Sequence, residues 1–376
     1  MNKRLHILFL SSWYPSRVLP SNGDFVQRHA EAVATKHNVT LIHVITDNNI
    51  KSVEKLSFTK NNINTTIVFI PKTNNPLIKL WLYFHSYFKE IKRINKFDIV
   101  HHNITYPLGI IALCIKWFKK TPYIITEHWT DYQPPLNKNI SFFTKMITKL
   151  ICRNASIISP VSIHLANGMQ KFGLKGNYYP IPNVVDTNLF KPKTTSKAQF
   201  NILHVSNMNN SHKNIKGILN SIKNIQNEID GFHFYLIGKN SIKYKVYSTK
   251  IGLKNTNISY IDSVNHTDLL EFFNLCNLFV LFSNYENLPC VILESFATGT
   301  PVISSNVGGI SEYFPKNFGK LIEPNNEKKL SNTILNFYYN KNQVASPKEM
   351  HKYAIDKFGI EAISTEFDKL YKKIKK

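Results

Sequence analysis

The sequence has few acidic residues, few cysteines and no long apolar run. Its 376 residues include 24 Asp and Glu against 47 Lys and Arg, a formal net charge of +23. The four cysteines stand far apart and form no Cys-x-x-Cys pair, so structural zinc and a disulfide framework are disfavoured and a reducing cytosol fits. Because Lys, His or Asn interrupts every apolar run, no transmembrane helix is predicted.

Three binding motifs are also missing. There is no Gly-x-Gly-x-x-Gly, which disfavours a nicotinamide or flavin dinucleotide, and no Gly-x4-Gly-Lys-Ser/Thr, which excludes a P-loop enzyme. There is no Asp-x-Asp, and hence no obvious carboxylate pair for a metal–diphosphate. We therefore expect neither a bound cofactor nor a metal site. The opening apolar patch contains a His and precedes no small-residue cleavage site, so it predicts a β-strand rather than a signal peptide.

The excess of basic residues favours an anionic partner, which could be a lipid surface, nucleic acid or a phosphorylated substrate. Composition alone is the alternative cause, because Lys, Asn and Ile are all abundant, as expected of an AT-rich genome. Aromatic and basic residues alternate at near-helical spacing in 84–97, 115–120 and 142–153. That pattern suits an amphipathic surface resting on a membrane, although solvated helix faces would look similar.

Strand and helix signals alternate along the chain. Short β-branched runs predict strands over residues 6–12, 39–46, 64–70, 97–102, 123–128 and 155–162, and then over 201–207, 232–238, 257–263, 277–283, 301–305 and 319–323. Helical patterns lie between several of them, including 24–37 with Asp24 as N-cap, 214–229 and 267–276. Such alternation predicts parallel sheets with helices on both faces.

The predicted fold class is therefore α/β, with two Rossmann-like domains facing each other across a cleft. A polar, Pro-containing stretch at 190–200 has the composition of a linker. We place an acceptor-binding domain over 1–190 and a donor-binding domain over 191–357, and expect a C-terminal helix at about 358–376 to pack back on the first domain. Ligands of such sheets bind beyond the carboxyl ends of the strands, so the loops there hold the candidate residues.

One of these loops, SNYENLPCVILES (283–295), carries two glutamates around an apolar run. Pro289 stands where a first helical turn would begin, which makes the following amides an anion site. Between 251 and 315 the only Lys or Arg is Lys254, so neither Glu286 nor Glu294 has an obvious local ion-pair partner. A ligand's hydroxyl groups would satisfy these carboxylates if they are buried. On spacing alone, the wet side of an amphipathic helix is the simpler explanation of Glu294.

The same stretch resembles the signature of retaining, GT-B-fold glycosyltransferases of family 4 (glycosyl transferases group 1) from bacteria. That signature reads Glu-(aromatic or Leu)-Pro, a second Glu, Ala/Gly-x-Pro-Val-Ile and Gly-Gly-x-x-Glu. The matching positions are Glu286, Leu288, Pro289, Glu294, Gly299, Pro301, Val302, Ile303, Gly308, Gly309 and Glu312. The resemblance extends over most of the chain, because VSIHLANGM, IPNVVDTNLFKP and TEHWTDY also fit the family.

The resemblance implies a donor site in the second domain. Glu294 would hold the ribose hydroxyls of a UDP- or GDP-linked sugar, and Glu286 would stabilise the charge that develops on the transferred sugar. Lys213 would neutralise the diphosphate. Donor contacts are also implied for the amides of Leu288, Cys290 and Val291 and for Gly308 and Gly309. The family usually has Arg six residues before this Lys, whereas Asn207 stands here without a charge. Either Lys216, Lys239 or an unplaced Arg compensates, or the diphosphate is held less tightly.

In the first domain, the resemblance makes His128 the catalytic candidate, directly after the apolar strand YIIT. Gly23 resembles the family's glycine loop, where a missing side chain lets the backbone approach the diphosphate. An ordinary Asn-Gly turn before a helix is compatible with that role. His101 and His102, at another strand end, are weaker candidates for acceptor contacts.

The implied function is metal-independent, retaining transfer of a hexosyl group from a nucleotide-diphosphate-sugar to a hydroxyl of a sugar or lipid-linked saccharide. Bacterial surface polysaccharide or glycolipid synthesis is the expected setting, in the cytoplasm or peripherally on the inner face of the cell membrane. A nucleotide-sugar epimerase or hydrolase on the same fold is one alternative. A basic nucleic-acid-binding protein is another, but only net charge supports it, so no nucleic-acid partner is expected.

Overall fold

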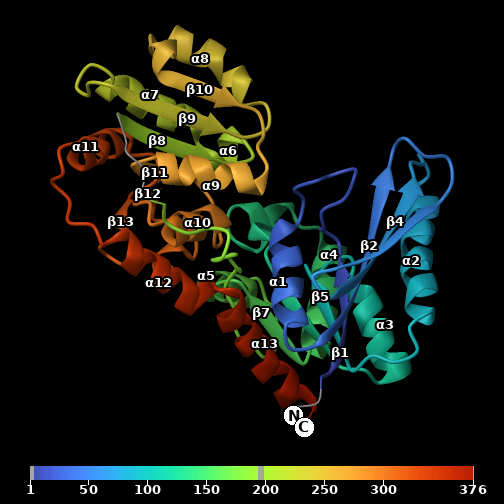
Figure 1. Ribbon diagram of the computed structural model, residues 1–376. Helices are drawn as coiled ribbons and strands as arrows, with labels where there is room; N and C mark the ends of the chain where they lie inside the picture. Colours follow the sequence, from blue (N-terminus) through green and yellow to red (C-terminus); the bar gives the residue numbers. More distant parts are fainter. Residues whose placement is uncertain (1–3, 194–198, 376) are drawn as a thin grey trace. The chain divides into compact units, whose positions relative to one another are not determined.

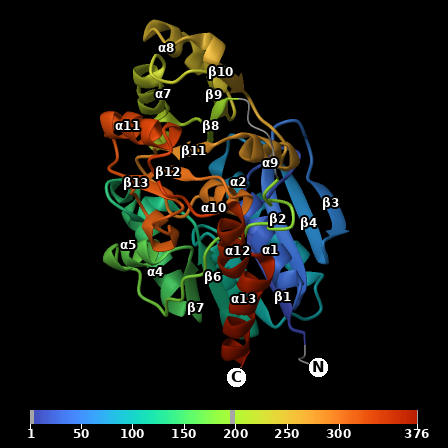
Figure 2. The same ribbon diagram turned by 60° about the vertical axis from the view of Figure 1, so that its left-hand side comes forward.

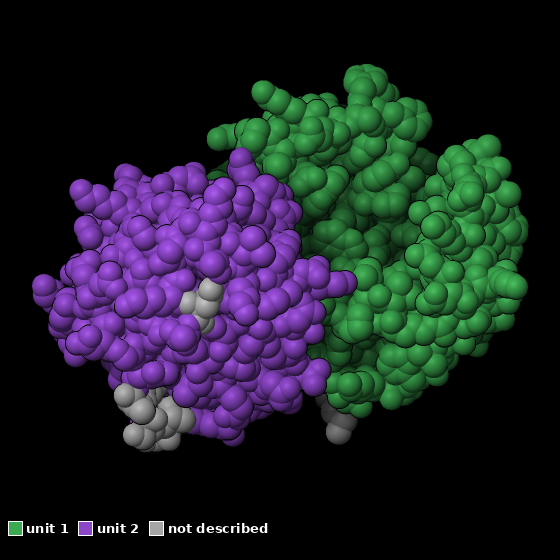
Figure 3. All heavy atoms as spheres, turned by 90° about the horizontal axis from the view of Figure 1, so that it is seen from above, with its two compact units in different colours: residues 1–184, 360–376 green, residues 185–359 purple. Residues whose placement is uncertain are grey.

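The computed structural model describes residues 4–193 and 199–375, which form two compact units (Figure 3). Unit 1 contains the described residues up to Val184 and those from Ile360 onward, and unit 2 is Val185–Gly359. The chain therefore passes from unit 1 to unit 2 at 184/185, whereas the sequence analysis placed the change at 190/191. Part of the expected linker, 194–198, lies outside the described residues.

Unit 1 is built on a seven-stranded sheet with the order β3-β4-β2-β1-β5-β6-β7 (Figures 1 and 2). All neighbours in it are parallel except β3, which pairs antiparallel with β4 at the edge. The strands are β1 His6–Ser11, β2 Asn38–Asp47, β3 Glu54–Lys60, β4 Ile63–Pro71, β5 Ile99–Asn103, β6 Tyr123–Glu127 and β7 Ile157–Pro160. The sequence analysis missed β3, whose seven residues are all exposed, because it has no buried face to give an apolar signal.

Helices cover both faces of this sheet. They are α1 Asp24–Ala34, α2 Pro76–Lys92, α3 Gly109–Lys119, α4 Phe142–Asn154, α5 Ile163–Lys171 and α13 Ile360–Lys375, with 3-10 turns η1 Thr130–Tyr132 and η2 Leu136–Asn139. On one face, α13 runs beside α1 and packs Phe367 and Tyr371 into the core (Figure 1). The other face carries α2, α3 and α4, as right-handed crossovers from β4 through β7 require. The N-cap of α1 is Gly23 rather than the expected Asp24, which begins the first turn.

Unit 2 is built on a six-stranded parallel sheet with the order β10-β9-β8-β11-β12-β13. Its strands are β8 Phe200–Val205, β9 Phe232–Ile237, β10 Ile258–Ile261, β11 Leu278–Leu281, β12 Val302–Ser305 and β13 Gly319–Ile322. Its helices are α6 Asn210–Lys213, α7 Ile215–Ile225, α8 Tyr244–Lys250, α9 His266–Leu275, α10 Cys290–Thr298, α11 Glu327–Tyr338 and α12 Pro347–Phe358, with 3-10 turns η3 Ser241–Lys243, η4 Asn255–Asn257 and η5 Ile310–Tyr313.

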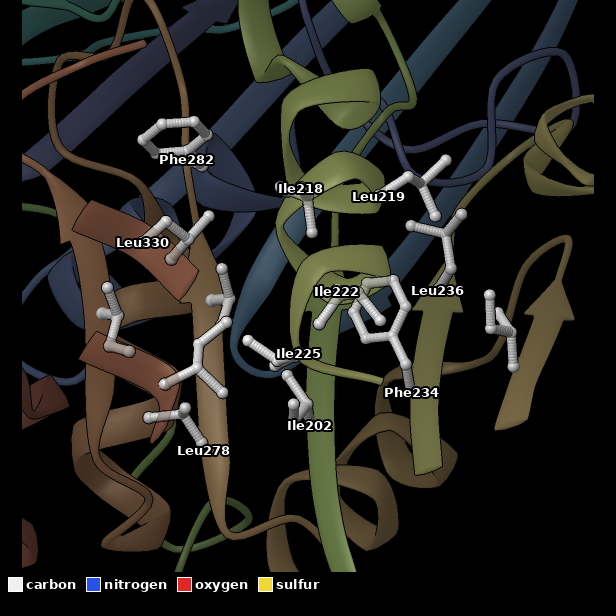
Figure 4. Close-up of a cluster of buried hydrophobic side chains, with 14 of the residues drawn as sticks. Ile202, Ile218, Leu219, Ile222, Ile225, Phe234, Leu236, Leu278, Phe282 and Leu330 are labelled. Atoms are coloured by element: carbon white, nitrogen blue, oxygen red, sulfur yellow. The ribbon is translucent and has the colours of Figure 1, made fainter. Parts of the chain in front are cut away.

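The α7 helix shows how sequence spacing builds the core of unit 2. Ile218, Ile222 and Ile225 recur at helical spacing within one buried cluster, in which Ile222 lies beside Phe234 of β9 and Ile225 beside Ile202 of β8 (Figure 4). Burying each such side chain contributes about 1.5–3 kcal/mol to folding. The two sheets with flanking helices establish the predicted α/β fold class.

Four buried histidines give folding a pH dependence. Burial lowers the pKa of His29, His43 and His204 to about 4 and that of His102 to about 3, from an ordinary value of 6.5. The unfolded chain therefore takes up protons below about pH 6.5, while the folded chain excludes them until the pH is much lower. Their stabilising effect is complete above pH 6.5 and falls with acidification.

We predict that the melting temperature drops steadily as the pH is lowered from 6.5 to 4. Each of the four histidines costs about 1.4 kcal/mol at pH 5.5. Thermal unfolding measured at intervals from pH 8 to pH 4.5 tests this. A melting temperature that stays constant between pH 6.5 and pH 5 would contradict it.

Candidate active site

In unit 1, the loops after β5 and β6 meet on one buried carboxylate. Glu127 ends β6, and one of its oxygens accepts hydrogen bonds from the backbone N–H groups of His128 and Trp129, both at 2.9 Å. The other oxygen accepts from the Thr105 N–H at 2.9 Å and the Thr105 hydroxyl at 2.6 Å. Among the described residues, no Lys or Arg forms an ion pair with Glu127. Burial raises its pKa, while the four hydrogen bonds oppose that rise.

His128 follows this anchor and lies against other rings. Its imidazole is 4.4 Å from the Phe25 ring and 5.4 Å from the His29 ring, measured between centroids. Burial, and then the proximity of His29, hold the pKa of His128 well below its ordinary value. The imidazole is therefore neutral at pH 7, able to donate a hydrogen bond from one nitrogen and accept at the other.

Gly23 has a packing reason for its identity. Its φ of +73° is left-handed, and a Cβ there would lie 2.4 Å from the carbonyl carbon and oxygen of Trp13. The loop after β1 thus folds back on itself where only glycine fits. This local requirement leaves the expected diphosphate contact as a prediction.

His101 and His102 lie inside β5 and are completely buried. His101 bonds the Tyr371 hydroxyl at 2.7 Å and the Thr126 hydroxyl at 2.6 Å, which ties β5 to α13 and β6. His102 lies 5.7 Å from the Tyr123 ring. The structure gives both residues core contacts rather than a place on an acceptor surface.

In unit 2, Glu286 and Lys213 form an ion pair, and Glu286 also accepts a hydrogen bond from the Ser283 hydroxyl at 2.7 Å. Glu286 is buried and Lys213 is mostly covered. The sequence analysis found no local ion-pair partner for Glu286, and the partner that the structure provides is distant in the sequence. Lys213 ends the α6 helix, 73 positions away.

Asn284 explains why Lys213 reaches this position. Its backbone N–H donates to the His212 carbonyl at 2.7 Å, and its side-chain amide donates to the Ser211 carbonyl at 3.0 Å. These bonds join the short α6 helix to the loop after β11.

Asn207, where the family usually has Arg, accepts a hydrogen bond from the Asn209 N–H at 3.1 Å and shapes the turn before α6. Lys216, one expected compensating charge, lies over the Tyr247 ring, with its Nζ 5.1 Å from the ring centroid. Lys239, the other, is exposed. Compensation for the missing Arg remains a prediction.

Glu294 is almost completely buried, and its Oε1 lies 3.3 Å from the His266 Nε2. Ser295 and Thr298 are buried too, so the wet-face explanation of this helix is wrong. The sequence analysis counted only Lys and Arg as local partners of Glu294 and therefore did not consider His266.

The α10 helix begins one residue later than predicted. Pro289 is its N-cap rather than its first residue, and Cys290 begins the helix. The Pro289 side chain has no oxygen that could accept a hydrogen bond from the first backbone amides of the helix. The amides of Cys290 and Val291 lie in the first turn, where the helix dipole is positive.

The Gly308-Gly309 turn packs directly on the loop that carries Glu286. Gly308 has a φ of +62°, and a Cβ there would lie 1.9 Å from the Glu286 carbonyl oxygen. The Gly309 N–H donates to the Asn287 carbonyl at 2.8 Å. The two glycines therefore hold the backbone of residues 286–287 in place.

The sequence analysis did not identify three residues that contact the candidate residues or their loops: Glu127, Thr105 and His266. An acidic residue closing a buried β-branched strand was a usable signal for Glu127. No spacing rule links Thr105 to Glu127 or His266 to Glu294, because the two residues of each pair lie in different elements of the fold.

The chain matches two protein families. Residues 186–357 match "Glycosyl transferases group 1" and residues 24–189 match "Glycosyltransferase Family 4". An uncharacterized glycosyltransferase of Methanocaldococcus jannaschii is 24% identical over 287 residues, which cover 76% of this chain and 78% of that protein. The putative teichuronic acid biosynthesis glycosyltransferase TuaC of Bacillus subtilis is 24% identical over 252 residues, 64% of this chain and 61% of that protein.

Solved structures agree on the fold. Sucrose-phosphate synthase from Thermosynechococcus elongatus has a TM-score of 0.79 at 19% identity, covering 99% of both chains. HepE from Anabaena, solved with UDP-glucose, has a TM-score of 0.75 at 16% identity, covering 98% of this chain and all of that one. The fold is thus that of the GT-B glycosyltransferases. The chain belongs to the group 1, family 4 glycosyltransferases, as its two family matches show.

We predict that Glu127→Gln loosens the loops after β5 and β6. An amide nitrogen cannot accept a hydrogen bond, so at least one loop loses its anchor, at a cost of about 1–3 kcal/mol. Amide hydrogen exchange in 103–108 or 128–133 should then accelerate by roughly 10- to 100-fold.

Thr105→Val is the matched control. It removes only the hydroxyl donor, so faster exchange should be confined to 103–108. If Glu127→Gln exchanges like the wild-type chain in both loops, Glu127 is not their anchor.

Proposed function

We propose that this protein transfers a hexosyl group, with retention of anomeric configuration, from a UDP- or GDP-linked sugar to a hydroxyl of a saccharide acceptor. The observation that carries the proposal is the Lys213–Glu286 ion pair beside the N-terminus of α10, with the buried Glu294 on the same helix. HepE, solved with UDP-glucose, supports a nucleotide-sugar donor.

In this proposal unit 2 binds the donor. The diphosphate lies at the start of α10, where the Leu288 amide precedes the helix, the amides of Cys290 and Val291 lie in its first turn, and the helix dipole favours negative charge. Lys213 neutralises the departing diphosphate, so the diphosphate and Glu286 share one ammonium group. Glu294 accepts hydrogen bonds from the ribose hydroxyls, and Gly308 and Gly309 keep the Glu286 loop in the required position.

Glu286 stabilises the positive charge on the anomeric carbon as its bond to the diphosphate oxygen breaks. The acceptor oxygen bonds to that carbon from the same face, and its proton passes to the released diphosphate. His128, neutral and anchored through Glu127, hydrogen-bonds the sugar in transfer, and the backbone at Gly23 approaches the diphosphate. Preorganised groups of this kind usually provide the largest part of a rate enhancement.

We propose that the diphosphate charge is met by these groups rather than by a metal ion, so a chelator should leave turnover unchanged. A nucleotide-sugar hydrolase or epimerase would act without acceptor, so a requirement for acceptor in product analysis distinguishes it from a transferase. The name of TuaC supports a place in bacterial surface polysaccharide or glycolipid synthesis. No described helix is long and apolar enough to cross a membrane. We propose a cytoplasmic location, peripheral to the inner face of the cell membrane.

Glu294→Ala should weaken binding of the donor nucleotide by about 1–3 kcal/mol, because the ribose hydroxyls lose their acceptor. Titration calorimetry with UDP and GDP measures this. Glu323→Ala, which removes an exposed carboxylate of the same unit, should bind like the wild-type chain.

His266→Ala separates the two roles of Glu294. If His266→Ala weakens binding as much as Glu294→Ala, the contact with His266 rather than the ribose contact is responsible. Unchanged affinity in Glu294→Ala would remove Glu294 from the donor site.

His128→Ala and Glu286→Ala should each lower turnover by roughly 100-fold or more at saturating donor, because each removes a group that acts on the sugar in transfer. Both variants should still fold and bind the free nucleotide. His164→Ala, on α5 of the same unit as His128, is the control and should retain turnover. Near-normal turnover in either test variant would mean that its role is wrongly assigned.

A further inference from the structure

The outer surface of α2, α3 and α4 is unusually apolar. These three helices lie side by side on one face of the unit 1 sheet, since α3 contacts both α2 and α4. Among the described residues, they hold ten of the twenty large hydrophobic side chains that are exposed. The ten are Leu77, Ile78, Leu80, Trp81, Trp117, Phe118, Phe142, Phe143, Met146 and Leu150. We call them the apolar set.

The α2 helix is apolar on two sides. Tyr87 and Ile91 face the sheet and are buried, and the Tyr87 hydroxyl donates to the Ser11 carbonyl at 2.7 Å. On the outer side, residues at helical spacing line a shallow depression, namely Leu77, Leu80, Trp81, Phe84, His85 and Phe88. Leu77 is 74% exposed and Trp81 61%. A helix needs only one apolar side to pack on a sheet, so the outer side requires another explanation.

This observation corrects the sequence-based choice of membrane segment. The interval 84–97 contains Tyr87, Ile91 and Phe97, which are core residues. The exposed apolar residues of α2 lie instead in its first two turns. Aromatic and basic residues alternate in both places, and only the structure separates the buried side from the exposed one.

The exposed residues of α3 and α4 extend the surface. Phe118 near the end of α3 is 84% exposed, and Phe142 at the start of α4 is 78% exposed. Basic residues accompany them: Lys116 and Lys119 on α3, and Lys145, Lys149 and Arg153 on α4.

The charge on this surface has one sign. The three helices contain a single acidic residue, Glu90. Glu90 is buried and paired with Lys55 and Arg93, both at short distance (2.7 and 2.6 Å). Exposed bulky apolar side chains among Lys and Arg match a lipid interface, where apolar groups enter the acyl boundary and ammonium groups meet phosphates.

We propose that the outer surface of α2–α4 binds an anionic lipid bilayer and inserts its apolar set into it. A second copy of the chain fits less well, because two such surfaces would bring like charges together. Nucleic acid would use the basic residues but would leave the aliphatic ones exposed. The inference deepens the proposed function, since it would present unit 1 to an acceptor carried on a lipid.

The experiment uses the full chain with vesicles of phosphatidylcholine alone or with phosphatidylglycerol. The charge variant is Lys79→Gln with Lys89→Gln and Lys92→Gln, and the apolar variant is Leu77→Ser with Trp81→Ser. Arg93 is left unchanged because it pairs with the buried Glu90.

Residues 242–250 of unit 2, from the η3 turn and the α8 helix, supply matched controls, because they also expose apolar residues beside lysines. We call these variants the α8 controls. The control variants are Lys243→Gln with Lys245→Gln and Lys250→Gln, and Ile242→Ser with Val246→Ser. They change the same number of charges or apolar groups at a place where no lipid contact is proposed.

Wild-type chain should co-sediment with anionic vesicles and not with neutral ones. The charge variant should lose roughly 100-fold in partition coefficient at low salt. The apolar variant should bind more weakly at every salt concentration, and both α8 controls should bind like wild type. Donor hydrolysis in solution should stay unchanged in all four variants, so loss of vesicle binding and loss of the proposed activity are distinguishable.

Three results would overturn the proposal. One is a wild-type chain that ignores anionic vesicles at low salt. Another is an equal loss of binding in the α8 controls. The third is evidence for another partner. In that case the α2 variants would abolish self-association or binding to a single-stranded oligonucleotide, while vesicle binding would persist.

Discussion

A parallel sheet must be covered by helices on both faces, and this constraint arranges most of the chain. In unit 1 the face that holds α1 is completed by α13, whose Phe367 and Tyr371 reach the core beside β1 and β5. The bond from Tyr371 to His101 connects that covering helix to the strand next to the Glu127 anchor. Parallel strands also bring their carboxyl ends to one edge, and for that reason the candidate residues of each unit follow strands β1, β5 and β6, or β8 and β11.

Carboxylates at these edges are buried, and each is satisfied in a different way. Among the described residues, Glu127 accepts four hydrogen bonds and pairs with no Lys or Arg, Glu286 contacts Lys213 and Ser283, and Glu294 contacts His266. An unpaired buried charge would cost several kcal/mol, so these partners are conditions for the fold as well as for any ligand. The hydrogen bonds of Glu127 hold two loops together. The partners of Glu286 and Glu294 are a Lys and a His, whose places beside these carboxylates a bound anion or hydroxyl group could take.

The sequence was sufficient for the twelve strands with a buried face, because β-branched runs and turn residues are local signals. Family resemblance indicated both glutamates through one contiguous motif and Lys213 through a separate stretch. The sequence did not reveal β3, which is exposed throughout, or the contacts of Glu286 and Glu294 with Lys213 of α6 and His266 of α9. Near-helical spacing over 84–97 indicated only the second half of α2 and assigned the wrong part of that helix to the surface, because apolar residues occur on both of its sides.

The return of α13 to unit 1 has a consequence for how these units could be recombined. Unit 2 is inserted into unit 1, so unit 1 is a discontinuous domain with one segment on each side of the insert. A fragment that stops at Val184 would lack Phe367 and Tyr371 and leave the α1 face of its sheet uncovered. Exchanging unit 2 between relatives would therefore call for replacing an internal segment, about 185–359, and keeping the last helix with unit 1.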